Sequence, residues 1–251
     1  MEVDLAIPVL NEELVLASSV ARILDYCRAE GFDNLSITIA DNGSSDATPS
    51  IARELARTLP QVRCIRVDRP ALGAALQEAW RSSSAAIVGY MDVDLTSDLG
   101  HLGKAIRFVA EGSCEMVLAS RQVPGAAVKD GSLLRLLISR SYNEILRRRL
   151  KFRGSDAACG FKLLTRGCYE RIAEGAELSE GLFFGSELAV RGFALGASIR
   201  EVPLDCTHRR DSRIRVLPSA IAYWREMGRL KRELACLSPA SMPRSEPGPR
   251  K

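Results

Sequence analysis

The chain has 251 residues, of which 46% are hydrophobic and 26% are charged, and its formal net charge is +4. This length and composition are typical of a globular protein with one large domain, and they argue against a disordered or fibrous protein. The small net charge gives no support for a nucleic-acid-binding protein, and no apolar run is long enough to span a bilayer.

Strand and helix patterns alternate regularly from the N-terminus to about residue 120. Short apolar runs predict buried strands, and longer segments with helical periodicity predict helices between them. In chain order we expect strand 3–9, helix 11–31, strand 35–41, helix 45–59, strand 62–68, helix 71–83, strand 85–92, helix 97–112 and strand 115–120. This alternation predicts an α/β fold with a mostly parallel sheet and helices on both faces.

The rest of the chain has a less regular pattern. In chain order we expect helix 132–150, strand 160–165, helix 185–196 and strand 198–205. The last residues are rich in proline and have no apolar period, so we expect them to be disordered. The predicted organisation is a domain over residues 1–216, a C-terminal helix over 217–237 and a disordered tail over 238–251.

Two aspartates, Asp92 and Asp94, come directly after the apolar run 85–91. Ligands of open parallel sheets bind beyond the carboxyl ends of the strands. If the backbone is still extended there, both carboxylates face the ligand and Val93 faces inward. Neighbouring carboxylates repel each other unless a cation lies between them, and Mg²⁺ or Mn²⁺ often joins carboxylates to phosphates. The pair therefore predicts a metal site for a diphosphate, with a solvated loop as the alternative.

Polar residues also follow the first two expected strands. Asn11 and Glu12 follow strand 3–9, where they can cap a helix or bind a ligand. Asp41 ends the second strand and Gly43 follows in a tight turn, so Asp41 can accept hydrogen bonds from a nucleobase or ribose. Each motif alone is also a good turn or cap, but three polar strand ends at one edge favour a ligand site.

Seven motifs along the chain resemble, in their order, those of family 2 glycosyltransferases. The motifs are IPVLNEE, DNGSSDAT, MDVDL, ASR, SDAACGFKLLTR, FFGSELAVRG and EVPL. Over about residues 3–216 the chain is most similar to the dolichyl- and polyprenyl-phosphate mannose and glucose synthases. The resemblance implies the Rossmann-like GT-A fold. It also implies a metal-dependent, inverting transfer of a hexose from a nucleotide-sugar, of the GDP-mannose or UDP-glucose type, to a polyprenyl or dolichyl phosphate.

The same resemblance assigns functions to individual residues. The implied donor-binding residues are Pro8, Asn11, Glu12, Asp41, Asn42, Gly43, Asp92, Asp94 and Arg121. The implied metal ligands are Asp92, Asp94 and Thr96. The implied contacts of the acceptor phosphate are Arg135, Ser139, Arg140, Arg209 and Arg213. The residues expected to act in catalysis are Asp94, Arg121, Arg135 and Glu187.

Some positions depart from the family pattern. Thr96 stands where a glutamine is frequent, Asn42 where a second aspartate is common, and Leu99 where a proline is frequent. Gly185 and Ser186 stand where close relatives often carry an aspartate and a threonine. These departures bear on the identity of the sugar more than on the type of reaction.

The acceptor decides which catalytic groups are needed. A phosphate monoester has a second pKa near ~6, so it is already an anion at pH 7 and needs arginines more than a base. A hydroxyl acceptor on a polysaccharide or small metabolite is the alternative, and it would need a base, for which Glu187 is the candidate. Glu187 and Asp156 could instead be salt-bridge partners of arginines. A non-catalytic binder with this fold is disfavoured because both aspartates after strand 85–92 are retained.

The helix 132–150 combines leucines and isoleucines with arginines. Basic amphipathic helices can lie in a membrane interface, so we expect this helix to contact the membrane surface, with a core helix as the alternative. The arginines lack interleaved aromatic residues, so we expect no nucleic-acid partner. No secretory signal is apparent, and the scattered cysteines form no CxxC pair. We therefore expect a cytoplasmic protein that lies peripherally at the inner face of the membrane.

Overall fold

The structure of the protein is a computed structural model that describes residues 1–94, 99–126, 128–129, 133–204, 206–207 and 216–236. A seven-stranded sheet forms its centre, in the order β3-β2-β1-β4-β7-β5-β8. The strands are β1 (Val3–Val9), β2 (Leu35–Asn42), β3 (Val62–Val67), β4 (Ile87–Met91), β5 (Met116–Ser120), β7 (Phe161–Thr165) and β8 (Ile199–Pro203). A second, two-stranded sheet pairs β6 (Val128–Lys129) with β9 (Cys206–Thr207).

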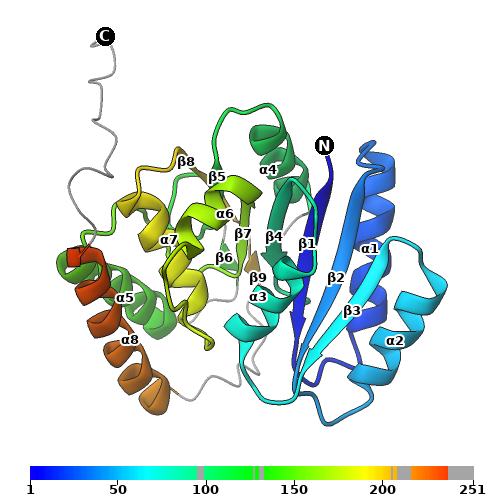
Figure 1. Cartoon of the computed structure of the whole chain (residues 1–251), viewed down its shortest axis with the longest axis horizontal. Coiled ribbons are helices and arrows are strands. Elements are labelled where there is room, and N and C mark those ends of the chain that lie inside the picture. Colours follow the sequence, from blue (N-terminus) through cyan, green and yellow to red (C-terminus); the bar gives the residue numbers. More distant parts are fainter. Residues whose placement is uncertain (95–98, 127, 130–132, 205, 208–215, 237–251) are drawn as a thin grey trace.

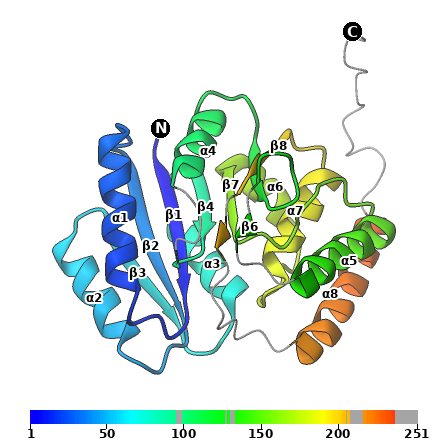
Figure 2. The same cartoon turned by 180° about the vertical axis from the view of Figure 1, so that it is seen from behind.

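Helices cover both faces of the large sheet, as the alternation predicts (Figures 1 and 2). One face carries α1 (Leu16–Ala29), α2 (Thr48–Thr58) and α4 (Gly100–Ala110). The other face carries α3 (Leu72–Arg81), α6 (Arg166–Ala173) and α7 (Phe184–Ala194). Outside this second layer, α5 (Leu133–Leu150) and α8 (Val216–Cys236) lie side by side.

Alternation along the strands produces two hydrophobic cores, one on each face of the sheet. In β1, Leu5 and Ile7 belong to the core under α1, α2 and α4, whereas Ala6 belongs to the core under α3. The small side chains of Ala6 and Ala40 leave room for Leu76 of α3 in the second core. The sheet is therefore buried on both faces, and its strand ends are left for polar side chains.

β7 is the antiparallel strand of the large sheet, between β4 and β5. Its first residue, Phe161, pairs with Met91, the last residue of β4. An antiparallel strand begins at the edge where its neighbours end, so the loop before β7 lies at the carboxyl edge of the parallel strands. This reversal brings Gly160 beside Asp92, because the Asp92 N–H donates to the Gly160 carbonyl oxygen at 3.0 Å.

The predicted strands are confirmed within a few residues, and the helices differ more at their starts. The helix expected over 11–31 begins at Leu16, because Asn11 has a left-handed φ of 57° that a helix does not accommodate. The helix expected over 97–112 begins at Gly100. The short helix α6 was not predicted, and Thr165 Oγ1 caps it by accepting the Cys168 N–H at 3.1 Å.

The C-terminal helix expected over 217–237 spans Val216–Cys236, whereas the predicted tail 238–251 lies outside the described residues. Within the described part of the chain, every helix is too short or too polar to cross a bilayer.

Candidate functional site

Hydrogen bonds join the turns that follow β1 and β2 at the carboxyl edge of the sheet. The Asn11 N–H donates to Ser44 Oγ at 2.9 Å, and Asn11 Oδ1 accepts from the Ser45 N–H at 2.8 Å. The Glu12 N–H donates to Thr48 Oγ1 at 2.8 Å. The structure therefore brings Asn11 and Glu12 together with the β2 turn, and their backbone and amide groups fix the shape of that turn.

Asp41 lies buried at the end of β2 with both carboxylate oxygens engaged. Its Oδ1 accepts from the Ser44 N–H at 2.9 Å, and its Oδ2 accepts from the Arg66 guanidinium at 2.7 Å. Asp41 and Arg66 are register partners on β2 and β3, so their side chains share one face of the sheet. Arg66 was not predicted as a site residue, because register between strands cannot be derived from a single strand.

Three further predicted donor-side residues lie at the same strand ends. Pro8 is buried inside β1, one residue before its end, and Asn42 is the buried last residue of β2. Gly43 has a φ of 89°, and a Cβ there would lie 2.9 Å from the Arg69 carbonyl carbon. Glycine is needed at this position both for the positive φ and for the close approach of the loop after β3.

Asp92 and Asp94 lie just beyond β4, which ends at Met91. The backbone is therefore not extended at the two aspartates, since residues 93–94 form a turn. Val93 is nevertheless buried in the core, as expected, while the Asp92 side chain is exposed and Asp94 is partly exposed. Thr96, the third predicted metal ligand, lies outside the described residues.

Charges from several elements meet at Asp92. Surrounding protein removes part of the water around its carboxylate, and together with the negative charge of Asp94 this raises the pKa of Asp92 to about 7. The positive charges of Lys162 and Arg121 oppose the rise in this pKa, and the charge of Glu12 adds to it. The pKa of Asp92, at the end of β4, is therefore affected by charged residues from the turn after β1, the end of β5 and the strand β7.

Gly160 gives the Asp92 carboxylate its space. A Cβ at position 160 would lie 1.8 Å from Asp92 Oδ2, a distance that no real side chain tolerates. A side chain at position 160 would therefore displace the Asp92 carboxylate, which is distant in sequence.

Arg121, at the end of β5, is held by Asp156. Its Nε donates to Asp156 Oδ2 at 2.7 Å and a terminal nitrogen donates to Oδ1 at 3.0 Å, so the pair is bidentate. Asp156 is fully buried, which by itself would raise its pKa, but the hydrogen bonds and charge of Arg121 lower that pKa below its ordinary value. Asp156 therefore fixes the plane of the Arg121 guanidinium.

Lys162 of β7 is a fully buried cation close to Asp92. Its Nζ donates to the carbonyl oxygens of Ala157 (3.0 Å) and Cys159 (2.7 Å) and to Tyr90 Oη (3.2 Å). Burial lowers the pKa of Lys162 to about 8. Lys162 lies within the motif SDAACGFKLLTR, but no function was predicted for it, because only the antiparallel pairing of β7 brings it to the end of β4.

The residues predicted to contact an acceptor phosphate are only partly described. Ser139 of α5 lies beside the segment after β5, since Gln122 Nε2 donates to Ser139 Oγ at 3.3 Å. Arg140 is exposed on the same helix. Outside the described part lie the side chain of Arg135 and all of Arg209 and Arg213.

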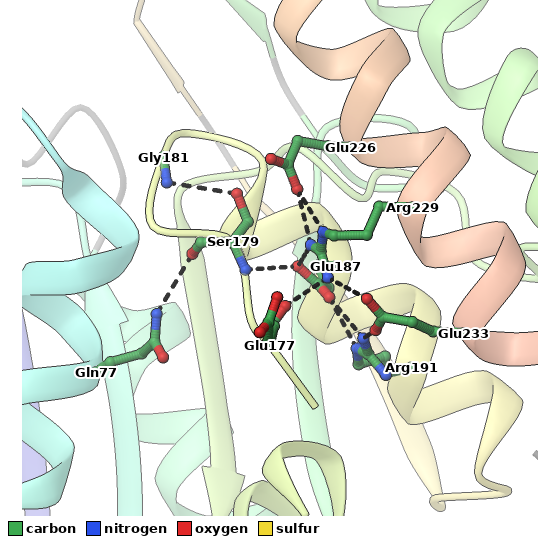
Figure 3. Close-up of polar contacts among 9 residues, drawn as sticks. All are labelled: Gln77, Glu177, Ser179, Gly181, Glu187, Arg191, Glu226, Arg229 and Glu233. Carbon is green, nitrogen blue, oxygen red and sulfur yellow. Dashed lines mark hydrogen bonds and ion pairs between the residues drawn. The ribbon is translucent and has the colours of Figure 1, made fainter. Parts of the chain in front are cut away.

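Glu187, expected as a catalytic carboxylate, is fully buried in the first turn of α7 (Figure 3). Its Oε2 accepts from the Ser179 N–H at 2.8 Å and from Arg229 at 2.7 Å, and its Oε1 accepts from Arg191 Nε at 2.9 Å. Both carboxylate oxygens are therefore occupied by donors of the protein itself.

Among the described residues, no group of three or more histidine, cysteine, aspartate or glutamate side chains is arranged as a complete metal site. Two carboxylates, Asp92 and Asp94, remain as candidate ligands. They suit a hard divalent cation that takes the rest of its oxygens from phosphates and water. The room that Gly160 leaves around Asp92 is consistent with this.

Comparison with known families and sequences gives consistent matches. The model of glycosyl transferase family 2 matches residues 4–173. A polyprenol monophosphomannose synthase from Mycolicibacterium smegmatis is 30% identical over 239 residues, covering 90% of this chain and 88% of that protein. Glycosyltransferase AglD from Haloferax volcanii is 29% identical over 219 residues, covering 85% of this chain. The chain spans only 34% of the length of AglD.

Solved structures share the fold at low sequence identity. Glucosyl-3-phosphoglycerate synthase from Mycobacterium tuberculosis, in complex with Mn²⁺, uridine-diphosphate and phosphoglyceric acid, matches with a TM-score of 0.65 and 18% identity, covering 94% of this chain and 79% of that chain. TarS of S. aureus matches with a TM-score of 0.59 and 15% identity, covering 95% of this chain and 66% of that chain. These structures support the GT-A fold.

Proposed function

The chain belongs to glycosyl transferase family 2 and is a glycosyltransferase, and from this premise we propose that it moves a hexose from a nucleotide-sugar to a polyprenyl or dolichyl phosphate, with inversion at the anomeric carbon. Its similarity to a polyprenol monophosphomannose synthase over 88% of that protein supports the lipid-phosphate acceptor. The second candidate is a transferase of the same fold that acts on a hydroxyl acceptor.

The donor nucleotide binds at the ends of β1 and β2. Asp41 accepts hydrogen bonds and Arg66 donates them, and the two side chains lie in contact at 2.7 Å. A base edge that carries a hydrogen-bond donor beside an acceptor complements such a pair, and guanine and uracil each carry an N–H beside a carbonyl oxygen. This pair is therefore compatible with a guanosine or uridine donor, of the GDP-mannose or UDP-glucose type that the resemblance implies.

Asp92 and Asp94 are the residues that would hold Mg²⁺ or Mn²⁺, and their position is the observation that carries the proposed function. They lie at the carboxyl edge where the charges of Glu12, Lys162 and Arg121 also act. When bound, the divalent cation neutralises negative charge on the leaving nucleoside diphosphate. Arg121, held in plane by Asp156, approaches the same diphosphate.

The acceptor side favours a phosphate over a hydroxyl. A hydroxyl nucleophile needs a base, and the candidate base Glu187 has both oxygens bonded to Arg191, Arg229 and the Ser179 amide. A phosphate monoester is already an anion at pH 7 and needs cations to hold it. Among the predicted phosphate contacts, Ser139 and Arg140 stand on α5 near the end of β5.

In the proposed function, the outer surface of α5 and α8 faces the membrane. Large apolar side chains are exposed on both helices, including Leu137 (58%), Ile221 (61%) and Trp224 (54%). The Arg149 guanidinium lies 3.7 Å above the Trp224 ring, and Arg148 is exposed on the same helix. Exposed apolar groups flanked by arginines suit an anionic lipid surface, where each basic residue contributes roughly 1 kcal/mol.

Thermal stabilisation by nucleotides tests the donor site. We expect GDP or UDP, in a panel that also contains ADP and CDP, to raise the melting temperature of the purified chain when Mn²⁺ is present. Asp94→Ala should abolish the metal-dependent shift, as should Gly160→Ala, whose methyl group would displace the Asp92 carboxylate. Asp33→Ala, at the opposite edge of the sheet, is the matched control and should keep the shift. No shift with any nucleotide would overturn the transferase proposal.

Paired acceptors separate the two candidate functions. A radiolabelled donor of the stabilising nucleotide class is offered polyprenyl phosphate, polyprenol or a soluble glycan under the same conditions. Product with polyprenyl phosphate alone supports the proposal. Product with polyprenol or glycan, but none with the phosphate, favours the hydroxyl-acceptor alternative.

Vesicle co-sedimentation tests the surface of α5 and α8. The chain should bind vesicles that contain anionic lipid and release them at high salt. Ile221→Ser combined with Trp224→Ser should weaken binding, whereas Leu14→Ser, which removes a 91% exposed leucine elsewhere, should not. Equal binding of all variants would count against this surface.

A further inference from the structure

A network of charged groups connects α7, α8 and the loop 177–181 (Figure 3). Its members on α7 are buried, and those on α8 are partly buried. Glu187 of α7 is its centre, since it accepts from Arg191 of the same helix, from Arg229 of α8 and from the loop amide of Ser179. Arg229 also donates to the backbone carbonyl oxygen of Glu177. The loop is therefore tied at two points to guanidinium and carboxylate groups that belong to two different helices.

Two carboxylates of α8 complete the network. Glu226 accepts from Arg229 at 2.7 Å, and Glu233 accepts from Arg229 at 2.8 Å and from Arg191. Buried ion pairs are costly to desolvate, and well-packed apolar residues can often replace them without loss of stability. A fully bonded network of this size is thus better explained by the fixed geometry it imposes than by the stability it adds.

The opposite side of the same loop is fixed to α3. The Ala74 N–H donates to the Glu180 carbonyl oxygen at 3.0 Å, and Gln77 Nε2 donates to the Ser179 carbonyl oxygen at 3.4 Å. A Cβ at Gly73 would lie 2.2 Å from that same Ser179 oxygen, so loop and helix are in direct contact. Any movement of the loop must therefore disturb the first turns of α3.

The segment before α3 leads to the donor side. Arg69 pairs with Glu180 of the loop, and the backbone of Arg69 packs against Gly43 in the turn after β2. A cavity of about 380 Å³ lies between residues 69–71, the loop 177–181, and Glu226 and Arg229 of α8. A continuous series of contacts thus runs from α8 through the loop to the strand end that carries Asp41.

We propose that Glu187 and Arg229 are positioning residues that clamp the loop 177–181 between α8 and α3, and that this clamp fixes the donor side of the site. The proposal rests on the proposed function in so far as it concerns the donor nucleotide. Glu187 is then not the base of the reaction: it acts through the loop that it holds. The C-terminal helix α8 is accordingly part of the catalytic unit as well as of the outer surface.

Hydrogen exchange on the full chain without ligands tests the clamp itself. In Arg229→Gln, the amides of residues 177–181 should exchange at least about tenfold faster, since a hydrogen bond to a charged group is lost. Glu187→Gln should have the same effect. If Glu187→Gln fails to fold, the exchange rates of Arg229→Gln alone decide whether the clamp exists. Arg232→Gln, an exposed arginine of the same helix, is the matched control. Unchanged exchange at 177–181 in Arg229→Gln would overturn the clamp.

Nucleotide affinity and the pH dependence of the transfer rate test the link between the clamp and the donor site. With Mn²⁺ present, Arg229→Gln should bind the stabilising nucleoside diphosphate about tenfold more weakly than Arg232→Gln does. In the transfer assay, Glu187→Gln should raise KM for the donor and leave the shape of the pH–rate profile unchanged. Loss of an acidic limb from the profile would instead identify Glu187 as a base and overturn the assignment.

Failure of the two proposals can be told apart. If the loop loosens in Arg229→Gln but nucleotide affinity stays at the wild-type value, the link between clamp and donor site is overturned. If the wild-type chain binds no nucleotide, the proposed function fails, and hydrogen exchange alone then decides the clamp.

Discussion

The two halves of the carboxyl edge are held together by different kinds of contact. On the donor side, Asn11 and Asp41 bond to backbone amides of the turn 43–48. In the other half, Arg121 pairs with the buried Asp156, and Glu187 pairs with Arg229 across 42 residues of chain. Apart from the ion pair of Asp41 with Arg66, the first half is thus organised by backbone amides and turns, and the second by ion pairs that join distant segments to a buried carboxylate.

This difference has an energetic consequence. A typical hydrogen bond to a turn contributes about 1 kcal/mol, and water can replace it at an exposed edge. Removing one member of a buried ion pair costs about 3–5 kcal/mol, because the other charge is left without compensation. We therefore expect the turns after β1 and β2 to tolerate single substitutions and the ion pairs of the other half to tolerate few.

The largest expected effect is that of Arg121→Met. The substitution leaves the fully buried Asp156 without its bidentate partner, so we expect a loss of about 3–5 kcal/mol in the free energy of unfolding. Urea denaturation would measure this loss. The double variant Arg121→Met with Asp156→Asn removes both charges and should recover part of it. A single variant as stable as the wild type would contradict the contrast between the two halves.

The same difference explains how much of the fold could be predicted. The strands and helices of the first half follow from local apolar patterns, and most predicted bounds are correct within a few residues. The antiparallel direction of β7 could not be predicted, because Phe161–Thr165 has the same pattern in either direction. The short helix α6 was missed because it follows β7 without an intervening turn signal.

The site was predictable to a similar degree. Asp41, Asp92 and Asp94 follow apolar runs, and their position at strand ends is visible in the sequence. Arg66 and Lys162 were not assigned a function, because their partners Asp41 and Tyr90 are brought to them by strand pairing. Long-range pairing is information that one sequence does not contain, and it dominates the second half.

Gly185→Ala tests whether position 185 must be glycine because of Tyr90, which is distant in sequence. A Cβ there would lie 2.2 Å from Tyr90 Oη, so we expect a loss of about 3 kcal/mol from overpacking. Tyr90→Phe removes the clashing oxygen, and the double variant should recover most of the loss because alanine favours the helix. Thermal and urea denaturation of all four proteins would measure the coupling. Simple additivity would contradict the interpretation.

A smaller effect is expected from the pH dependence of Lys162. Its pKa in the folded state is lowered from 10.5 to about 8, so between these values the unfolded chain binds more protons and stability rises with pH. Lys162→Met lacks this titration. The stability of the wild type relative to Lys162→Met should therefore increase by on the order of 2 kcal/mol between pH 7.5 and pH 10. A constant difference would show that the buried lysine titrates normally.

The smallest effects are expected on the donor side, at Asn11. Asn11→Gly removes the acceptor of the Ser45 amide but keeps a residue suited to the φ of 57°, so we expect a loss of about 1 kcal/mol. Asn11→Ala removes the same acceptor and adds the cost of a left-handed alanine, about 1 kcal/mol more. Urea denaturation should rank the wild type above Asn11→Gly and Asn11→Ala last. A loss at Asn11→Gly as large as that of Arg121→Met would mean that this turn is no more tolerant than the buried ion pairs, and the two halves would then share one mode of organisation.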